Sequence, residues 1–124
     1  MSDRHFGQFR VFVYVGNILV KGDLSRRLRE AVRFDWDAGN VEKNWVKHSV
    51  RYTECEEVFS REPVVVPVRD RPGSREERFI VLGRTAVGRR LSIAFTFRGD
   101  RIRVISAREM NRKERREYSR NEET

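Results

Sequence analysis

The sequence predicts an α+β fold in which a helical hairpin packs on an antiparallel β-meander and a C-terminal helix follows. Three apolar stretches predict three consecutive strands, at residues 79–82, 91–97 and 102–105. The connections between them, at 86–89 and 98–100, are short and contain glycine. Connections this short join antiparallel neighbours. Apolar and polar residues alternate along the middle stretch, which is the period of a sheet with one buried face.

This alternation assigns the side chains of the middle strand to two faces. We expect the apolar face to be buried together with parts of the helical hairpin: Leu91, Ile93, Phe95, Phe97, Val58, Phe59 and Trp45. The opposite face carries Arg90, Ser92, Ala94 and Thr96. Arginines gather at the strand ends: Arg78, Arg84, Arg89, Arg90, Arg98, Arg101, Arg103 and Arg108. We therefore expect a solvated, arginine-rich face that binds an anionic partner.

The length of 124 residues allows one domain with a small core. The chain has 27 Lys and Arg against 19 Asp and Glu, and residues 63–124 alone hold sixteen basic and nine acidic residues. This excess favours a phosphate backbone as partner, because bound cations release counterions from a nucleic acid. A solvated basic surface without a ligand is the alternative.

Cysteine and histidine usage excludes several kinds of site. Cys55 is the only cysteine, and His5 and His48 are far apart, so we predict no disulfide, no zinc site and no cofactor. This composition fits a reducing, cytoplasmic setting. The apolar run 11–20 is interrupted by Gly16-Asn17, is too short to span a bilayer and lacks a cleavage site, so we predict neither a membrane segment nor a signal peptide.

Residues 1–31 are expected to form an N-terminal extension, and residues 32–124 the main domain. Two interpretations of the extension remain open. One is a hairpin that turns at Gly16-Asn17, followed by a short helix with Leu24 and Leu28; the other is a segment that packs poorly. Neither interpretation assigns chemistry to it.

The first helix of the hairpin is predicted to follow a brief strand at 34–37. Asp37 is a suitable N-cap, and Val41, Trp45 and His48 recur at helical spacing to form one apolar stripe.

The second helix is predicted to begin at a capping box formed by Thr53 and Glu56. Its apolar face consists of Cys55, Val58 and Phe59. Pro63 ends the helix, and residues 64–68 read as a strand that Pro67 confines to the edge of the sheet, because proline cannot donate a ladder hydrogen bond.

A charged, turn-rich loop is predicted at 69–75, ahead of the meander. After the meander, Asn111 and Glu114 have the spacing of a helix cap, and the last helix should run to about Glu123. Tyr118 is its single large residue with an apolar body, so we expect this helix to be weakly docked, frayed or held by a partner.

Five characteristic pieces lie between Phe34 and Tyr118: FDWD, NWVKHSV, EERFIVLGRT, RGDRIRVISAR and NRKERREY. In their order and spacing, this part of the chain resembles the BrnT toxins of bacterial type II toxin–antitoxin systems. The resemblance implies a RelE-like fold and a metal-independent endoribonuclease that inhibits translation by cutting RNA. It also implies a BrnA-type antitoxin as partner and RNA, free or on the ribosome, as substrate.

The sequence departs from the family pattern in three places. Ser49 stands where the family has glycine, which affects a helix C-terminus that favours the left-handed conformation. The loop before Glu76 has Arg71-Pro72-Gly73 and lacks the histidine often found there. Residues 1–31 have no counterpart.

The chemistry implied by the resemblance assigns roles to several residues. Arg84 and Arg108 are expected to stabilise a pentavalent phosphorane, and Lys47 or His48 to transfer protons. His48 could instead be a half-buried, hydrogen-bonded residue. Tyr118 is expected either to act on the RNA, by stacking on a base or orienting the attacking hydroxyl, or to anchor its helix. The candidate RNA-binding residues are Arg78, Arg90, Arg101 and Arg103.

Two non-enzymatic functions use the same surface. A non-catalytic RNA-binding module is one, although such modules display aromatic residues on an open sheet face, whereas Phe95 and Phe97 share the face of Leu91 and Ile93. An interaction subunit whose arginines contact an acidic partner, here the antitoxin, is the other.

Overall fold

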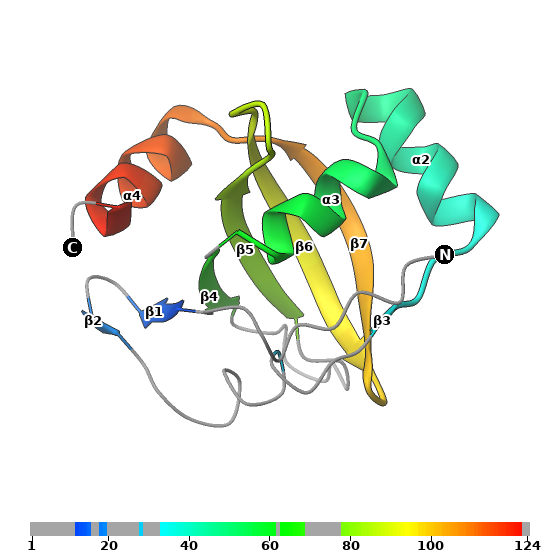
Figure 1. The fold of residues 1–124 in the computed structure, drawn as a ribbon, viewed down its shortest axis with the longest axis horizontal. Helices are drawn as coiled ribbons and strands as arrows, with labels where there is room; N and C mark the ends of the chain where they lie inside the picture. The colour runs from blue at the N-terminus through cyan, green and yellow to red at the C-terminus, as the bar shows by residue number, and fades with distance from the viewer. Residues whose placement is uncertain are drawn as a thin grey trace.

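The computed structural model describes residues 12–15, 18–19, 28, 33–61, 63–68 and 78–122. Within these residues one mixed sheet of seven strands has the order β2-β1-β4-β5-β6-β7-β3. The strands are β1 (Phe12–Val15), β2 (Ile18–Leu19), β3 (Arg33–Phe34), β4 (Val64–Val68), β5 (Arg78–Arg84), β6 (Arg90–Arg98) and β7 (Arg101–Glu109). The helices are α2 (Ala38–His48), α3 (Tyr52–Phe59) and α4 (Arg112–Glu122). Figure 1 shows α3 crossing one face of the sheet, α2 along the outer side of β7, and α4 beyond β5.

The predicted meander is confirmed as β5, β6 and β7, which pair antiparallel in sequence order. The face that α3 covers holds the main core, and most residues expected there are buried: Leu91, Ile93, Phe95, Val58 and Phe59. Phe97 is partly buried and packs against this core. The α+β class is therefore confirmed, whereas the RelE-like relation stays a prediction.

The expectation of a solvated opposite face is wrong. Ser92 and Thr96 point to that face and are buried, with 3 % and 2 % of their surface exposed. A second apolar cluster lies there, formed by Val64, Leu82, Met110 and Tyr118 with Ile80 against it. Helix α4 contributes Tyr118 to this cluster, so both faces of the sheet are partly covered.

Strand β4 is not the edge strand that its proline predicted. Strand β1 pairs with it in parallel, through Phe12 with Val64 and Val13 with Val65. Pro67 pairs with Phe79 of β5, and it lies two residues beyond the last pairing with β1. The proline is tolerated because β1 pairs only with the first half of β4, so β1 does not need a hydrogen bond from the N–H that Pro67 lacks.

The N-terminal segment contributes to the sheet and to the core. Strands β1 and β2 pair antiparallel, as the hairpin interpretation predicted, and Leu28 is buried in the main core. The predicted turn at Gly16-Asn17, Leu24 and the charged loop at 69–75 lie outside the described residues. In the part of the chain that is described, no helix is long and apolar enough to cross a membrane.

Helix α2 packs against the edge of the sheet through two asparagines. Asn40 Nδ2 donates to the carbonyl of Val104 at 3.2 Å, and Asn44 Oδ1 accepts from the backbone N–H of Ala107 at 2.9 Å. The apolar stripe predicted for this helix is wrong, since Trp45 is 48 % exposed. The reason is that the helix faces the edge of β7, where unpaired backbone groups require polar partners.

The predicted cap of α2 is confirmed, and that of α3 is wrong. Asp37 caps α2 by accepting from Asn40 N–H at 2.8 Å. Helix α3 begins at Tyr52, one residue before Thr53, which was the predicted cap. Its start is fixed by Glu54, which accepts a hydrogen bond from the N–H of Arg51 at 3.0 Å. Glu56 is instead buried and accepts from Trp36 Nε1 at 2.9 Å.

Candidate functional site

Three arginines from three adjacent strands lie on one face at one end of the sheet. Arg84 at the end of β5 is directly opposite Arg90 at the start of β6. Arg108 of β7 is opposite Ser92, which places it diagonal to Arg90 at a Cα separation of about 7–8 Å. We call Arg84, Arg90 and Arg108 the Arg84 cluster. Like charges directly opposite one another destabilise a sheet, so this arrangement favours binding of an anion.

Glu114 from the first turn of α4 holds Arg108 in a fixed orientation. The two side chains form a bidentate ion pair with N–O distances of 2.7 and 3.1 Å, and Ser92 Oγ donates to the same carboxylate at 2.8 Å. Burial alone would raise the pKa of Glu114, but hydrogen bonds from Arg108, the backbone of Asn111 and Ser92 hold it below its ordinary value. The hydrogen bond with Glu114 raises the pKa of Arg108, so the guanidinium stays charged.

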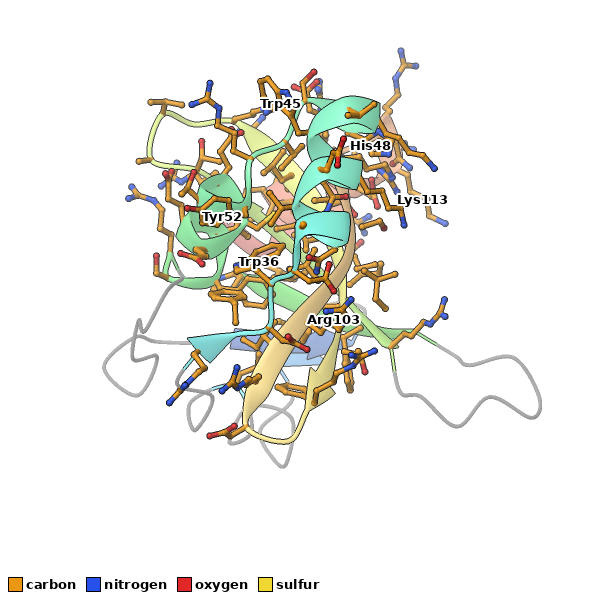
Figure 2. The ribbon with its side chains drawn as sticks, turned by 90° about the vertical axis from the view of Figure 1, so that its right-hand side faces the viewer. Trp36, Trp45, His48, Tyr52, Arg103 and Lys113 are labelled. Carbon is orange, nitrogen blue, oxygen red and sulfur yellow. The ribbon has the colours of Figure 1, made fainter. Side chains whose placement is uncertain are left out.

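Lys47 and His48 end helix α2 on the molecular surface, and both are exposed. Figure 2 shows His48 directed outward from α2. Ser49 follows in the left-handed conformation, with φ of 54°, which explains why a glycine suits this position. The helix therefore ends in a strained turn that needs support from its surroundings.

Arg89 supplies this support and joins α2 to the β5–β6 hairpin. Its guanidinium donates to the carbonyls of Ser49 at 2.7 Å and His48 at 3.3 Å, and it pairs with Glu54 at 3.1 Å. The C-terminal ends of α2, β5 and β7 consequently lie at the same end of the molecule (Figure 1). The structure thus brings Lys47 and His48 to the end of the sheet that carries the Arg84 cluster.

The remaining predicted RNA-binding arginines lie at the opposite end of the sheet. Arg78 begins β5, and six positions along the strand at about 3.3 Å each separate it from Arg84 by roughly 20 Å. Arg78 and Arg103 line a pocket of about 370 Å³ together with Arg98 and Lys43. Arg101 begins β7 and is exposed.

Among the arginines at this end of the sheet, Arg103 already forms ion pairs with carboxylates of the protein. Arg103, which is labelled in Figure 2, bonds Asp37 at 2.8 Å and approaches Asp35 at 3.5 Å. The hydrogen bond from the backbone of Asn40, followed by that from Arg103, holds the pKa of Asp37 below its ordinary value. These carboxylates neutralise part of the positive charge of the pocket.

Tyr118 is placed as an anchor. Its side chain is 3 % exposed and packs with Val64, Leu82 and Met110. A ring buried in this way offers no face on which a base could stack from solvent. Of the two roles expected from the sequence, its burial favours anchoring α4.

The match to a protein-family model agrees with the sequence motifs. The model of the family described as the ribonuclease toxin BrnT of type II toxin–antitoxin systems matches residues 36–114. The chain belongs to the BrnT family. Membership implies RNA cleavage and an antitoxin partner. The matched range runs from Trp36 to Glu114 and includes Lys47, His48 and the whole Arg84 cluster.

Among solved structures, the chain is similar to the crystal structure of the ribonuclease toxin BrnT of Brucella abortus. The two are 18 % identical with a TM-score of 0.47, over 64 % of this chain and 97 % of that chain. No curated protein matches the sequence.

The sequence does not indicate the contacts that Arg89, Glu54 and Ser92 make at this BrnT-family site. Arg89 was recognised as a strand-end arginine, but its carbonyl partners lie some 40 positions away in the chain. Glu114 was recognised only as part of the helix cap, which is confirmed by reciprocal bonds with Asn111 at 2.8 and 2.9 Å.

The remaining candidates for chemistry do not form a site. Burial raises the pKa of the Cys55 thiol to about 12, so it is neither a nucleophile nor a metal ligand at neutral pH. Among the described residues, no group of His, Cys, Asp or Glu could hold a metal ion.

Proposed function

We propose that this BrnT-family protein is a toxin that cleaves RNA by internal transfer to the 2′-hydroxyl, without a metal ion. The 2′-oxygen attacks the adjacent phosphorus and loses its proton to a base, and a pentavalent phosphorane forms. The bond to the 5′-oxygen then breaks, and an acid gives this oxygen a proton. The products are a 2′,3′-cyclic phosphate and a 5′-hydroxyl.

Arg84 and Arg108 are proposed to stabilise the phosphorane. The arrangement of the Arg84 cluster on one sheet face is the observation that carries this proposal, because fixed cations directed at developing negative charge give a large share of catalysis. Arg108 is held by Glu114 through two hydrogen bonds, so its orientation is set before RNA binds. A preorganised donor costs no reorganisation during the reaction.

Lys47 or His48 is proposed to move the protons. Both are exposed at the end of α2 that Arg89 ties to the β5–β6 hairpin. Histidine and lysine side chains both serve as proton donors or acceptors in enzymes.

Phosphate binding is proposed for the remaining arginines. Arg90 contacts the phosphate that flanks the scissile one, whereas Arg78, Arg101 and Arg103 contact RNA about 20 Å away along the sheet. Because Asp37 and Asp35 compensate Arg103, this arginine contributes less than Arg78.

A BrnA-type antitoxin in the cytoplasm is proposed to neutralise the toxin by covering the basic surface, and free toxin inhibits translation. Co-expression with the neighbouring open reading frame, followed by size-exclusion chromatography, tests this proposal. A complex is expected. Separate elution, with cells that tolerate the protein alone at high level, argues against it.

An RNA cleavage assay in EDTA, with and without ribosomes, tests the mechanism. Replacing Arg84 or Arg108 with alanine should lower kcat about a hundredfold with little effect on RNA binding. Arg33→Ala is the matched control, because this exposed arginine of β3 lies at the other end of the sheet. Loss of wild-type activity in EDTA contradicts the metal-free step, and full activity of Arg84→Ala, Arg108→Ala, Lys47→Ala and His48→Ala contradicts the placement of the site.

A further inference from the structure

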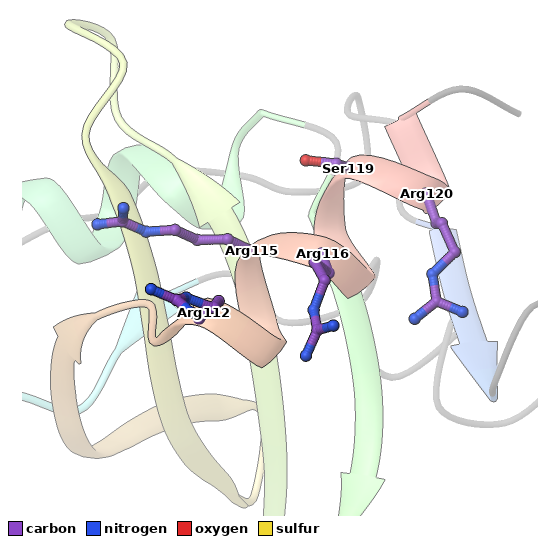
Figure 3. Close-up of a pocket in the computed structure, with 5 residues that line it drawn as sticks. All are labelled: Arg112, Arg115, Arg116, Ser119 and Arg120. Atoms are coloured by element: carbon purple, nitrogen blue, oxygen red, sulfur yellow. The ribbon is translucent and has the colours of Figure 1, made fainter.

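Helix α4 carries a line of arginines along its outer side. Arg112, Arg116 and Arg120 recur every fourth residue, so they lie on one side of the helix, spaced about 6 Å apart along its axis. We call these three the α4 stripe. With Arg115 and Ser119 they line a shallow surface hollow of about 540 Å³ (Figure 3).

The other side of α4 is fixed to the sheet. Tyr118 is buried among Val64, Leu82 and Met110, and Glu114 binds Arg108 and Ser92. Residues 114 and 118 point inward, and the residues of the α4 stripe are separated from them by roughly 120–160° around the helix axis at 3.6 residues per turn. The stripe therefore faces outward on a helix whose position is set by its own packing.

Charge on this face is largely uncompensated. Arg120 pairs with Glu117 at 3.1 Å, whereas Arg112, Arg115 and Arg116 form no ion pair among the described residues. Like charges four residues apart destabilise a helix, so Arg112 and Arg116 oppose one another in the free protein. An anion that binds along the helix removes this repulsion.

A phosphate backbone fits this face better than a protein does. The lining of the hollow consists of arginines and one serine and includes no aromatic residue or methionine, whereas the centre of a protein interface is enriched in these residues as well as in arginine. Planar guanidinium groups bind phosphate in a bidentate manner. A row of them at regular spacing suits successive phosphates of one strand.

We propose, on the basis of the proposed function, that the α4 stripe binds the phosphate backbone of the single-stranded RNA substrate beyond the cleavage site. Arg108 of the Arg84 cluster is joined to the first turn of α4 by its ion pair with Glu114. An RNA strand held at the Arg84 cluster can therefore continue onto Arg112 and then along the helix.

The test measures binding of a 2′-O-methyl uridine oligonucleotide by fluorescence anisotropy across a range of salt concentrations. The modified probe has no free 2′-hydroxyl, so binding is measured independently of cleavage. Each phosphate contact to a single strand contributes about 0.7 to the slope of log K against log salt. Arg116→Gln should lower the slope by about 0.7, and the triple variant Arg112→Gln/Arg116→Gln/Arg120→Gln by about 2.

Arg33→Gln is the matched control, because it removes one arginine charge at an exposed position on β3, at the end of the sheet opposite the Arg84 cluster. Its slope should stay close to that of the wild type. Equal slopes for Arg116→Gln and Arg33→Gln, or no binding of the probe by the wild type, would overturn the inference. Circular dichroism confirms that the variants remain folded.

The outcome is separable from that of the proposed function. Cleavage by the wild type together with an unchanged slope in the triple variant overturns the α4 stripe and leaves the ribonuclease proposal standing. A reduced slope without any cleavage supports the stripe and contradicts the ribonuclease proposal. If the triple variant keeps the RNA slope but loses the co-expressed antitoxin, the face binds protein and the inference fails.

Discussion

At Gly83, β5 approaches α3 too closely to leave room for a side chain, and replacement by alanine is a sensitive test of this packing. A Cβ on Gly83 would lie 2.7 Å from Val58 Cγ1 and 3.7 Å from Pro63 Cβ. Two carbons normally stay about 3.5–4.0 Å apart, and Val58 is fully buried. Strand or helix must therefore shift by about 1 Å.

The expected change in the free energy of unfolding of Gly83→Ala is the balance of two opposing effects. Overpacking of a core costs about 1–3 kcal/mol, and the lower flexibility of alanine in the unfolded chain offsets about 0.5–1 kcal/mol. Gly83→Ala should therefore lower the free energy of unfolding by about 1–2 kcal/mol. Val58→Ala alone should cost about 2–3 kcal/mol, because it leaves a cavity.

The double variant distinguishes this clash from a general effect of the substitution. The methyl group that Gly83→Ala introduces fills space that Val58→Ala opens, so the double variant should be more stable than the sum of the single effects by about 1 kcal/mol or more. Urea unfolding followed by circular dichroism measures all four proteins. Additive effects, or a Gly83→Ala protein as stable as the wild type, would show that the close approach to Val58 is not what requires glycine at this position.

Four further predictions follow from individual contacts. Glu114→Gln should be less stable than the wild type at neutral pH, and this difference should shrink as the pH falls below 4.5, the ordinary pKa of a glutamate. The reason is that the pKa of Glu114 in the folded protein lies below 4.5, so protonation at low pH removes the stabilisation that its carboxylate provides. A difference in urea unfolding that does not depend on pH contradicts this. Asn44→Ala should cost about 3 kcal/mol in urea unfolding, since it leaves the buried N–H of Ala107 without its partner, whereas a change at an exposed position of α2 should cost less than about 0.5 kcal/mol. Arg89→Ala should cost about 2 kcal/mol by losing the bonds to two carbonyls and Glu54, and a loss no greater than that of Arg33→Ala would refute this role. Cys55 should react with a thiol reagent at pH 8 only as fast as the protein opens, because burial raises its pKa to about 12; an immediate reaction of the native protein rules out this burial.

Local patterns in the sequence predicted those parts of the fold that depend on neighbouring residues. The alternation from Leu91 to Phe97 defined the middle strand and its buried face, since side chains alternate in any strand. The caps at Asp37 and Asn111 were predictable because each bonds a residue three positions away. The family motifs placed Lys47, His48, Arg84 and Arg108 in the matched range.

Tertiary packing determined which side of each helix packs against the sheet. The sequence of α2 indicated an apolar stripe with Trp45, yet the helix turns Asn40 and Asn44 inward, because it meets the edge of a strand and not the face of a sheet. Helix α4 docks through one tyrosine and one carboxylate, whose partners are Leu82 and Arg108.

The division of the arginines was also decided by the fold. Strand direction places Arg84, Arg90 and Arg108 at one end of the sheet and Arg78, Arg101 and Arg103 at the other, although they are interleaved in the sequence. The amino-acid composition does not distinguish between these two groups of arginines. Their effects differ because electrostatic interactions depend on distance and on neighbouring carboxylates, and both are set only when the strands pair.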